Sequence, residues 1–309
     1  MKIKSLASIK FIILAILFTF AAIHMASANE QAIEEKIEEA IKEPITVVYT
    51  KPLSELDQRI VYPLEVLKLV LSKTNINFKL QPSRVAMTQN RALKMLALGV
   101  GVDVVWSMTN EIRETNLTPI RVPLYKGLIG WRLLLIKSAN QTRFDKLNTL
   151  ADLQRYIAGQ GHDWPDTDIL AANGFRIVSS SSYEGLFEML EKNRFDFFPR
   201  SIIEIGNELK SHTEYNLSIE KTLLLHYPAA FYFFVNRANS ALKIRLENGF
   251  NTAISDGSFD ALFYKYNQQH IQQANIQKRK ILKLHNPNLP SATPLDNAEL
   301  WLTPTAAQH

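Results

Sequence analysis

An arginine inside an apolar run is the first residue whose side chain could take part in binding or catalysis. In "GLIGWRLLLIK", residues 127–137, Arg132 lies among residues with strand propensity. Burying an unpaired guanidinium is strongly unfavourable, so either its head reaches solvent or an anion meets it. Arg132 is therefore a candidate for binding an anion.

A second candidate is the acidic loop "GQGHDWPDTDIL", whose proline suits the first turn of a helix. Its aspartates, Asp163, Asp166 and Asp168, would repel a carboxylate there, but they could cap the helix or accept from a ligand amine or hydroxyl. A metal site with His162 is the weaker interpretation, because the loop matches neither a calcium pattern nor a zinc spacing. We predict no metal ion and no cofactor.

Catalytic patterns are missing from the sequence. There is no cysteine, which excludes disulfides, a thiol nucleophile and cysteine metal sites. We find no nucleophile elbow, and no isolated carboxylate with an acid–base partner. The sequence predicts a binding protein without catalytic residues.

Aromatic residues supply candidate walls for a ligand. Trp106 ends one predicted strand and Trp164 follows another, at the edge where open α/β sheets bind ligands. Tyr62, before the first long helix, is a further candidate. The alternative for each is a place in the hydrophobic core.

These residues depend on alternating strands and helices. "ITVVYT", "INFKLQP" and "VDVVWSMT" predict strands separated by two amphipathic helices, and a second alternating set spans 156–211. This order favours an α/β fold in which mostly parallel sheets are flanked by helices. The aromatic string "HYPAAFYFFVNR" predicts one long strand, and two helices parted by an Asp-Gly-Ser turn follow it.

The N-terminus predicts export. Three lysines precede an apolar run of about 13 residues, short of the ~20 that span a bilayer, and small residues end at Ala28. We predict a signal peptide, 1–28, cleaved after Ala28, and a periplasmic protein; the alternative is a retained membrane anchor. A leader helix is predicted over 29–43.

Charge argues against nucleic acid as a partner. Without the three leader lysines the formal charge falls from +5 by three, to +2. No basic stripe interleaved with aromatic residues is present in the sequence.

Three strings, in order, resemble the extracellular solute-binding proteins of the amino-acid-binding type (family 3), bilobed periplasmic receptors that feed ABC importers. The strings are "RALKMLALGVGVDVVWSMT", "YEGLFEMLEKNRFDFFPR" and "ALKIRLENGFNTAISDGSFDALFYKY". The similarity runs from about Ile45 to Asn267.

The resemblance implies a type II periplasmic-binding-protein fold with a discontinuous first lobe. Lobe 1 would comprise 44–130 and 228–309, and lobe 2 would comprise 131–227. Crossings near 128–133 and 226–232 would join them.

The resemblance also implies a ligand anchor. Arg113, in "SMTNEIRETNL", lies where the family places the arginine that grips a ligand carboxylate, after a strand that delivers Ser107 and Thr109. One more residue separates Thr109 from Arg113 than in the commonest family pattern. The alternative is an exposed turn on which Arg113 pairs with Glu111 or Glu114.

On a crossing strand, Arg132 would border the cleft and meet a ligand anion or an acidic neighbour. The alternatives are a salt bridge across the hinge or a head that reaches water.

The strand that begins "RFDFF" departs from the family. There the family has an aspartate that holds the ligand's ammonium, whereas this chain has Arg200 or Ser201. An arginine has no acceptor, so Arg200 facing the cleft would favour carboxylates or other anions. Two alternatives stay open: Asp166 supplies the ammonium partner, or Arg200 pairs with Glu204 one turn later.

These observations predict a monomeric receptor that captures a small polar or anionic solute, amino-acid-like or an organic acid, and presents it to an ABC permease. One alternative is a sensory module that signals to a membrane protein without transport. Another is a dehydratase-like enzyme on the same scaffold.

Overall fold

The computed structural model describes residues 44–53 and 58–302. The predicted signal peptide and leader helix lie outside the described residues. Within the described ranges, no helix combines the length and apolarity that crossing a membrane requires.

Contacts divide the described residues into two units. The smaller one holds Ile45, Thr46 and Asn75–Lys79, where the Ile45 amide donates to the Asn77 carbonyl over 2.9 Å. The larger one holds the described part of Val47–Thr74 and of the chain from Leu80 onward. The pocket described below lies in the larger unit.

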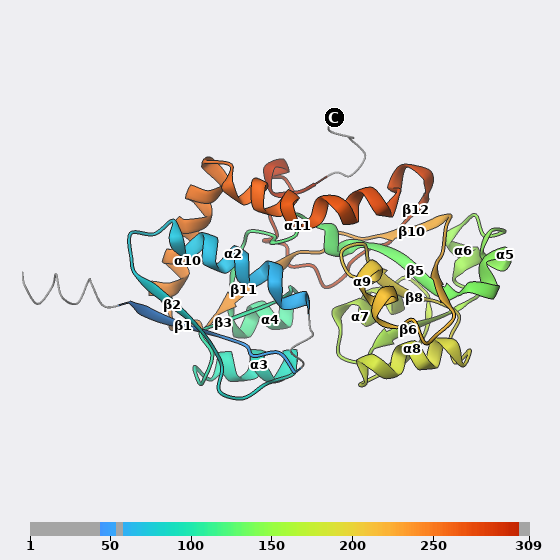
Figure 1. The fold of residues 1–309 in the computed structure, drawn as a ribbon, viewed down its shortest axis with the longest axis horizontal. Helices are drawn as coiled ribbons and strands as arrows, with labels where there is room; N and C mark the ends of the chain where they lie inside the picture. Colours follow the sequence, from blue (N-terminus) through green and yellow to red (C-terminus); the bar gives the residue numbers. More distant parts are fainter. Residues whose placement is uncertain (1–43, 54–57, 303–309) are drawn as a thin grey trace, which may run out of the picture. The chain divides into compact units, whose positions relative to one another are not determined.

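The first sheet brings together strands from both ends of the chain (Figure 1). Its order is β2-β1-β3-β11-β4, with β1 Ile45–Tyr49, β2 Phe78–Pro82, β3 Val104–Met108, β4 Thr118–Ile120 and β11 Phe231–Val235. β3 runs parallel to β1, whereas β11 runs antiparallel to both β3 and β4. At its amino end β3 pairs with β1, where Val104 lies opposite Tyr49, and at its carboxyl end it pairs with β11, where Met108 lies opposite Phe231.

Helices α2 Val61–Ser72, α3 Gln89–Ala97, α10 Ser240–Ser255 and α11 Ser258–Ala274 accompany this sheet. α3 and the sheet share a core cluster that includes Leu93, Leu96, Val105 and Phe234. α10 packs on both α2 and α11 (Figure 1). Gly257 has φ +75°, which confirms the predicted turn between α10 and α11.

The second sheet is mixed. Its order is β12-β10-β5-β8, with β9 beside β5, and the strands are β5 Trp131–Lys137, β8 Phe198–Ser201, β9 Leu217–Ile219, β10 Leu223–His226 and β12 Lys280–Lys283. β5 runs antiparallel to β8, β9 and β10. A separate parallel pair consists of β6 Ile157–Gly161 and β7 Arg176–Ser180.

The remaining helices are short. They are α4 Glu111–Asn116, α5 Gln141–Phe144, α6 Leu150–Leu153, α7 Pro165–Ala172, α8 Tyr183–Glu191 and α9 Ile205–Ser211, with 3-10 turns η1 Gln58–Ile60, η2 Leu128–Gly130, η3 Ser138–Asn140, η4 Ile276–Lys278 and η5 Ala298–Leu300. α7 and α8 pack on β6 and β7, as the predicted second α/β set requires.

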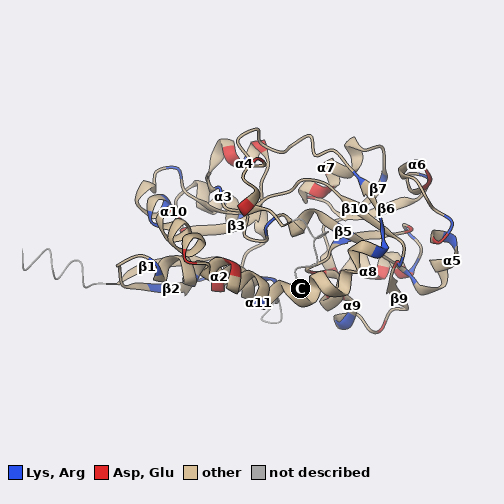
Figure 2. Cartoon of the chain, turned by 90° about the horizontal axis from the view of Figure 1, so that it is seen from above, with Lys and Arg blue, Asp and Glu red and all other residues tan. Residues whose placement is uncertain are grey.

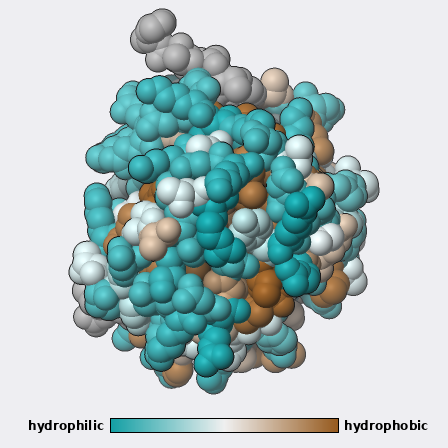
Figure 3. Space-filling view, turned by 90° about the vertical axis from the view of Figure 1, so that its right-hand side faces the viewer, coloured by the Kyte–Doolittle hydropathy of each residue, from teal (hydrophilic) through white to brown (hydrophobic). Residues whose placement is uncertain are grey.

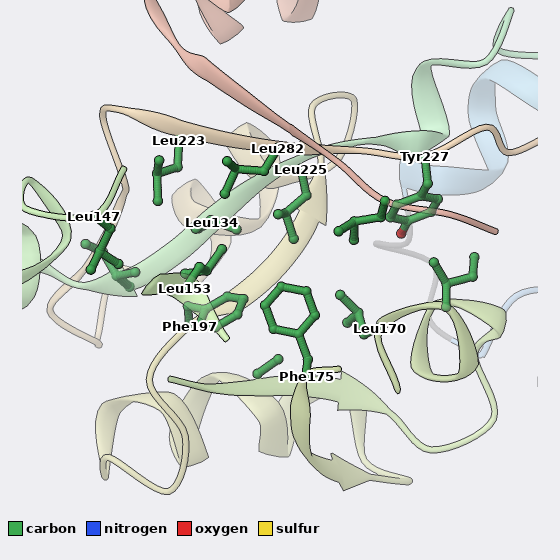
Figure 4. Close-up of a cluster of buried hydrophobic side chains, with 14 of the residues drawn as sticks. Leu134, Leu147, Leu153, Leu170, Phe175, Phe197, Leu223, Leu225, Tyr227 and Leu282 are labelled. Carbon is green, nitrogen blue, oxygen red and sulfur yellow. The ribbon is translucent and has the colours of Figure 1, made fainter. Parts of the chain in front are cut away.

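A cluster of buried apolar side chains supports the second sheet (Figure 4). Leu134, Leu225 and Leu282 contribute from three neighbouring strands, and Phe175 faces them from the segment before β7. Tyr227 lies at one side of this cluster (Figure 4). Burial of these side chains fixes the sheet beneath the pocket.

The two predicted crossings lie side by side. The Tyr227 amide donates to the Gly130 carbonyl over 3.2 Å, and a Cβ built on Gly130 would lie 2.0 Å from the Tyr227 oxygen. Only glycine allows this approach.

Three features differ from the sequence predictions. The sheets are mixed rather than mostly parallel, because β11 and β5 run antiparallel to their neighbours. The string "HYPAAFYFFVNR" is interrupted, because Pro228, between β10 and β11, has no amide to donate. Lys280–Lys283 was not predicted as a strand, but it forms β12 and pairs with β10 in the second sheet. Helix α11, which has 17 residues and is about 25 Å long, connects α10 to the segment that contains β12.

Acidic and basic residues are interspersed over the elements in Figure 2. Figure 3 shows a mainly hydrophilic face with scattered hydrophobic spots. The described lysines and arginines form no continuous stripe in the view of Figure 2.

Candidate functional site

A cavity of about 90 Å³ collects residues from distant parts of the chain. Its lining is Arg59, Gln89, Met108, Ile129, Arg132, Trp164, Pro165, Asp166, Arg200, Glu204 and Phe231. These residues come from or adjoin strands of both sheets, the crossing at η2, and the first turns of α3 and α7. Of the predicted site residues, the cavity brings together Arg132, Trp164, Asp166 and Arg200.

Arg113 adjoins this cavity from α4. The Asn110 side chain caps α4 by accepting from the Arg113 amide over 2.8 Å, so the helix begins directly after β3. The Arg113 guanidinium donates to the Ser107 hydroxyl over 2.7 Å, to the Met108 carbonyl and to the Gln89 side-chain oxygen over 3.4 Å. Met108 and Gln89 both line the cavity.

Among the described residues, every acceptor of the Arg113 guanidinium is neutral. Within the described ranges Arg113 forms no ion pair, although it is only 8% exposed. Burial lowers the pKa of Arg113 to about 10, and Asp163 and Asp166 act in the opposite direction. The predicted alternative, an exposed turn on which Arg113 pairs with Glu111 or Glu114, is not observed among the described residues: Arg113 is buried, and Glu114 binds Arg121 over 2.6 Å.

Ser107 and Thr109 are both buried but differ in their contacts. Ser107 accepts from Arg113, as described above. The Thr109 hydroxyl donates to Glu114 over 2.6 Å, and Thr109 does not line the cavity. A ligand contact of Thr109 stays a prediction.

The charge of Arg132 is compensated by acidic residues within its otherwise apolar surroundings. Its side chain is 3% exposed and forms ion pairs with Asp166 at 2.5 Å and with Glu204 at 3.4 Å. Burial lowers the pKa of Arg132, but Asp166, Tyr227 and Glu204 outweigh this and raise it above its ordinary value. The head does not reach water; it lines the cavity beside acidic neighbours.

Asp166 is held in the first turn of α7. The Tyr227 hydroxyl donates to its Oδ1, the oxygen that also faces Arg132. Among the described residues, none donates a hydrogen bond to Oδ2. No aspartate of the loop caps α7, since its N-cap is Trp164; Asp163 instead accepts from Asn90 over 2.6 Å.

Arg200 is 2% exposed and its charge is compensated within the protein. It binds Glu208 at 2.6 Å and Glu204 at 3.2 Å. Its guanidinium also lies 4.7 Å from the Trp164 ring centroid. The pairing with Glu204 was one of the predicted alternatives; an anchoring role of Arg200 for a ligand anion stays a prediction.

The aromatic candidates separate into two groups. Trp164 lines the cavity. Trp106 contacts Tyr49 and Phe233 with centroid distances of 6.3 and 6.1 Å, and it is outside the cavity lining. Tyr62 is buried and donates to the Leu124 carbonyl over 2.7 Å, also outside the lining.

Sequence reasoning did not select four of the residues that shape this site: Arg59, Gln89, Glu204 as a cavity residue, and Glu208. The four-residue spacing of Arg200, Glu204 and Glu208 does not mark a helix face, because Arg200 lies in β8 and Glu204 precedes α9. No signal in the sequence marks Arg59 or Gln89 either.

The fold has many solved counterparts. A Salmonella typhimurium periplasmic binding protein described for its high arginine specificity aligns with TM-score 0.54 and 16% identity, covering 72% of this chain and 99% of that one. A substrate-binding protein of an amino acid ABC transporter aligns with TM-score 0.54 and 11% identity, covering 72% and 99%. A histidine kinase sensor domain similar to periplasmic binding proteins aligns with TM-score 0.52 and 14% identity, covering 74% and 97%.

This chain has the two-lobed periplasmic-binding-protein fold. The expected two-lobed α/β fold is thereby confirmed, with mixed rather than mostly parallel sheets. In sequence, no family model matches the chain and no curated protein matches it.

Proposed function

We propose that the chain is a non-enzymatic solute receptor that binds a small carboxylate in the cavity beside Arg113. The observation that carries the proposal is the buried Arg113 guanidinium, whose acceptors, Ser107, Met108 and Gln89, are all neutral. A buried cation without an anion is unfavourable, and a carboxylate would supply two acceptors in the fork geometry that arginine prefers.

The solute would stabilise one arrangement of the lobes, and a membrane partner would recognise it. We propose export with cleavage after Ala28, a periplasmic monomer, and delivery to an ABC permease. The fold shared with a substrate-binding protein of an amino acid ABC transporter supports this role.

Sensing without transport is the second candidate, favoured by the fold shared with a histidine kinase sensor domain. Neighbouring genes separate the two: adjacent permease and ATPase genes support transport, and an adjacent sensor-kinase gene supports sensing. An enzymatic role has less support, because the cavity carboxylates Asp166 and Glu204 are both paired with arginines.

The test is a thermal-shift screen of the chain from Asn29 against small carboxylates, followed by calorimetry. A ligand present at 100 times its dissociation constant adds about 2.7 kcal/mol of stability. Arg113→Ala should weaken binding of any hit by about 2–5 kcal/mol, the scale for truncating one partner of a buried charge pair.

Arg121→Ala is the matched control, because Arg121 pairs with Glu114 rather than lining the cavity. Binding should be nearly unchanged in this variant. Hits whose affinity is insensitive to Arg113→Ala would contradict the proposed anchor.

A further inference from the structure

The chain continues beyond the strings that resemble the solute-binding family, the last of which ends at Tyr266. After β12 it runs through residues 284–302, which contain Pro287, Pro290, Pro294 and the 3-10 turn η5. We call residues 284–302 the C-terminal strap. In Figure 1 the strap belongs to the red part of the chain that follows β12. Its two ends are held by different parts of the fold.

The strap begins at the second sheet. Leu284 is buried in the core cluster of that sheet, and its amide donates to the His226 carbonyl over 2.8 Å, which extends the pairing of β12 with β10. The side chain of Asn173, at the end of α7, donates to the His285 carbonyl over 2.7 Å and accepts from the His285 amide over 2.9 Å. The first end of the strap is therefore anchored to the second sheet and to α7.

The other end of the strap is held by the first sheet and by the start of the first crossing. Trp301 packs against the core cluster that α3 shares with the first sheet, and its ring covers Gly127. The Leu302 amide donates to the Lys126 carbonyl over 2.9 Å, and the Lys126 ammonium donates to the Glu299 carbonyl over 3.0 Å. Lys126 and Gly127 have φ values of +47° and +82°, which are uncommon for a lysine. The strap thus contacts the residues whose special backbone conformation leads into the crossing.

Between these ends, the strap contacts the second crossing. The buried side chain of Asn286 donates to the Pro228 carbonyl over 2.9 Å. The Asn288 amide donates to the Asn286 side-chain oxygen over 3.1 Å, which holds the orientation of that side chain. One segment of the chain therefore contacts both crossings as well as parts of both sheets.

Turns shorten the strap between its anchored ends. Fully extended, residues 284–302 could span about 60 Å. Instead, the Thr293 amide donates to the Pro290 carbonyl over 2.9 Å, and the Trp301 indole donates to the Pro294 carbonyl over 2.7 Å. The prolines restrict φ and so reduce the number of other conformations. The two ends can therefore separate only if these turns open.

We propose that the C-terminal strap limits rotation of the two sheets about the crossings. Hinge motion needs a few residues that change φ and ψ, and it moves the parts on either side of the hinge relative to each other. Because the strap is anchored on both sides, such rotation has to open its turns or release Trp301 from Gly127. The strap thereby keeps together the cavity residues that both sheets contribute. This inference goes beyond the proposed function, because it holds whichever solute binds.

Distance measurements on the ligand-free protein test the restraint. The sequence has no cysteine, so Lys94→Cys on α3 and Glu188→Cys on α8 provide two unique and exposed sites for spin labels. Because α3 packs on the first sheet and α8 on β6 and β7, double electron–electron resonance then reports how the two parts move relative to each other. Trp301→Ala should broaden the distance distribution, because it uncovers Gly127 and removes the hydrogen bond to Pro294.

Cutting the strap is a second test, which does not require Trp301→Ala to fold. A protease recognition sequence inserted between Ser291 and Ala292, which are both exposed, allows cleavage after the protein has folded. The cut breaks the covalent connection between the two anchored ends, so the distribution should broaden. Leu295→Ala, which changes an exposed residue of the strap, is the matched control and should leave the distribution unchanged.

Melting curves followed by circular dichroism establish that each protein is folded at the temperature of the measurement. A distribution that is as narrow after cleavage as before it would overturn the proposal. Equal broadening in Trp301→Ala and Leu295→Ala would also contradict it, because the anchoring contacts would then have no special effect. These measurements are independent of the carboxylate screen: if no carboxylate binds, the proposed receptor function loses its support and the role of the strap does not.

Discussion

Two buried arginines of this protein have opposite electrostatic surroundings. Arg132 is 3% exposed and lies against two carboxylates, so its desolvation is offset inside the protein. Arg113 is 8% exposed and has neutral acceptors among the described residues. We assign the first to the wall of the site and propose the second as the ligand anchor.

Removal of Arg132 should therefore affect stability strongly. Arg132→Met leaves Asp166 buried without its cation, and we expect the free energy of unfolding to fall by about 3–5 kcal/mol. Adding Asp166→Asn should recover part of this loss, because the unpaired charge disappears. Urea denaturation of both variants measures the difference.

Lys192→Met is the control, because Lys192 pairs with Glu188 at the surface and should contribute little. A double variant no more stable than Arg132→Met would contradict the charge-pair explanation.

At the scale of elements, β5 and β10 place their side chains in register across an antiparallel pair. His226 lies opposite Trp131, and their ring centroids are 4.1 Å apart. β12 brings Lys283 opposite His226 on the other side. Burial, and secondarily Lys283, lower the pKa of His226 to about 4.

This arrangement predicts an acid-sensitive stability. The ordinary pKa of His226 is 6.5 and its folded pKa is about 4, so the unfolded chain binds more protons between these values. The contribution is fully present above pH 6.5 and is lost as the pH falls towards 4. Since the ring is half-buried, we expect a loss of about 1–2 kcal/mol.

Denaturation curves over this pH range, for the wild type and for His226→Phe, provide the measurement. The variant should show a flatter dependence of unfolding free energy on pH. Identical slopes would show that His226 does not cause the sensitivity.

At the scale of the whole molecule, the crossings connect the two sheets and the C-terminal segment packs against them. The Asn286 side chain donates to the Pro228 carbonyl over 2.9 Å, and the Trp301 ring covers Gly127. Lys126 binds Asp260 at 2.5 Å and donates to the Glu299 carbonyl over 3.0 Å. The crossings thus depend on contacts with residues distant in sequence.

Gly130 and Tyr227 bring the two crossings into direct backbone contact. Gly130→Ala would place a Cβ 2.0 Å from the Tyr227 carbonyl oxygen, a backbone atom that cannot move aside alone. We expect a loss of about 1–3 kcal/mol or more in unfolding free energy, the scale of overpacking. Differential scanning calorimetry would measure it.

Gly206→Ala, in α9, is the matched control, because its nearest neighbour would be a flexible side-chain atom 3.9 Å away. This substitution should be neutral or stabilise the helix by about 0.5–1 kcal/mol. Equal effects of the two substitutions would argue against a steric role for Gly130.

The sequence determined much of the architecture by itself. Apolar periodicity predicted α2 and α8, the Asp-Gly-Ser turn predicted the break between α10 and α11, and strand–helix alternation predicted the α/β class. The residue types selected Arg132 and Asp166, and the resemblance to the solute-binding family selected Arg113 and Arg200. Such signals depend on residues close together in the sequence, so they can be interpreted without the tertiary structure.

Only the tertiary structure decided how those charges are compensated. Glu208 reaches Arg200 from α9, Tyr227 reaches Asp166 from the returning crossing, and β12 joins the second sheet after α11. Each of these contacts depends on strand order and direction, which residue spacing does not specify. Whether an arginine is a structural partner or stays uncompensated for a ligand is a property of the packed chain, because electrostatic energy depends on three-dimensional distance.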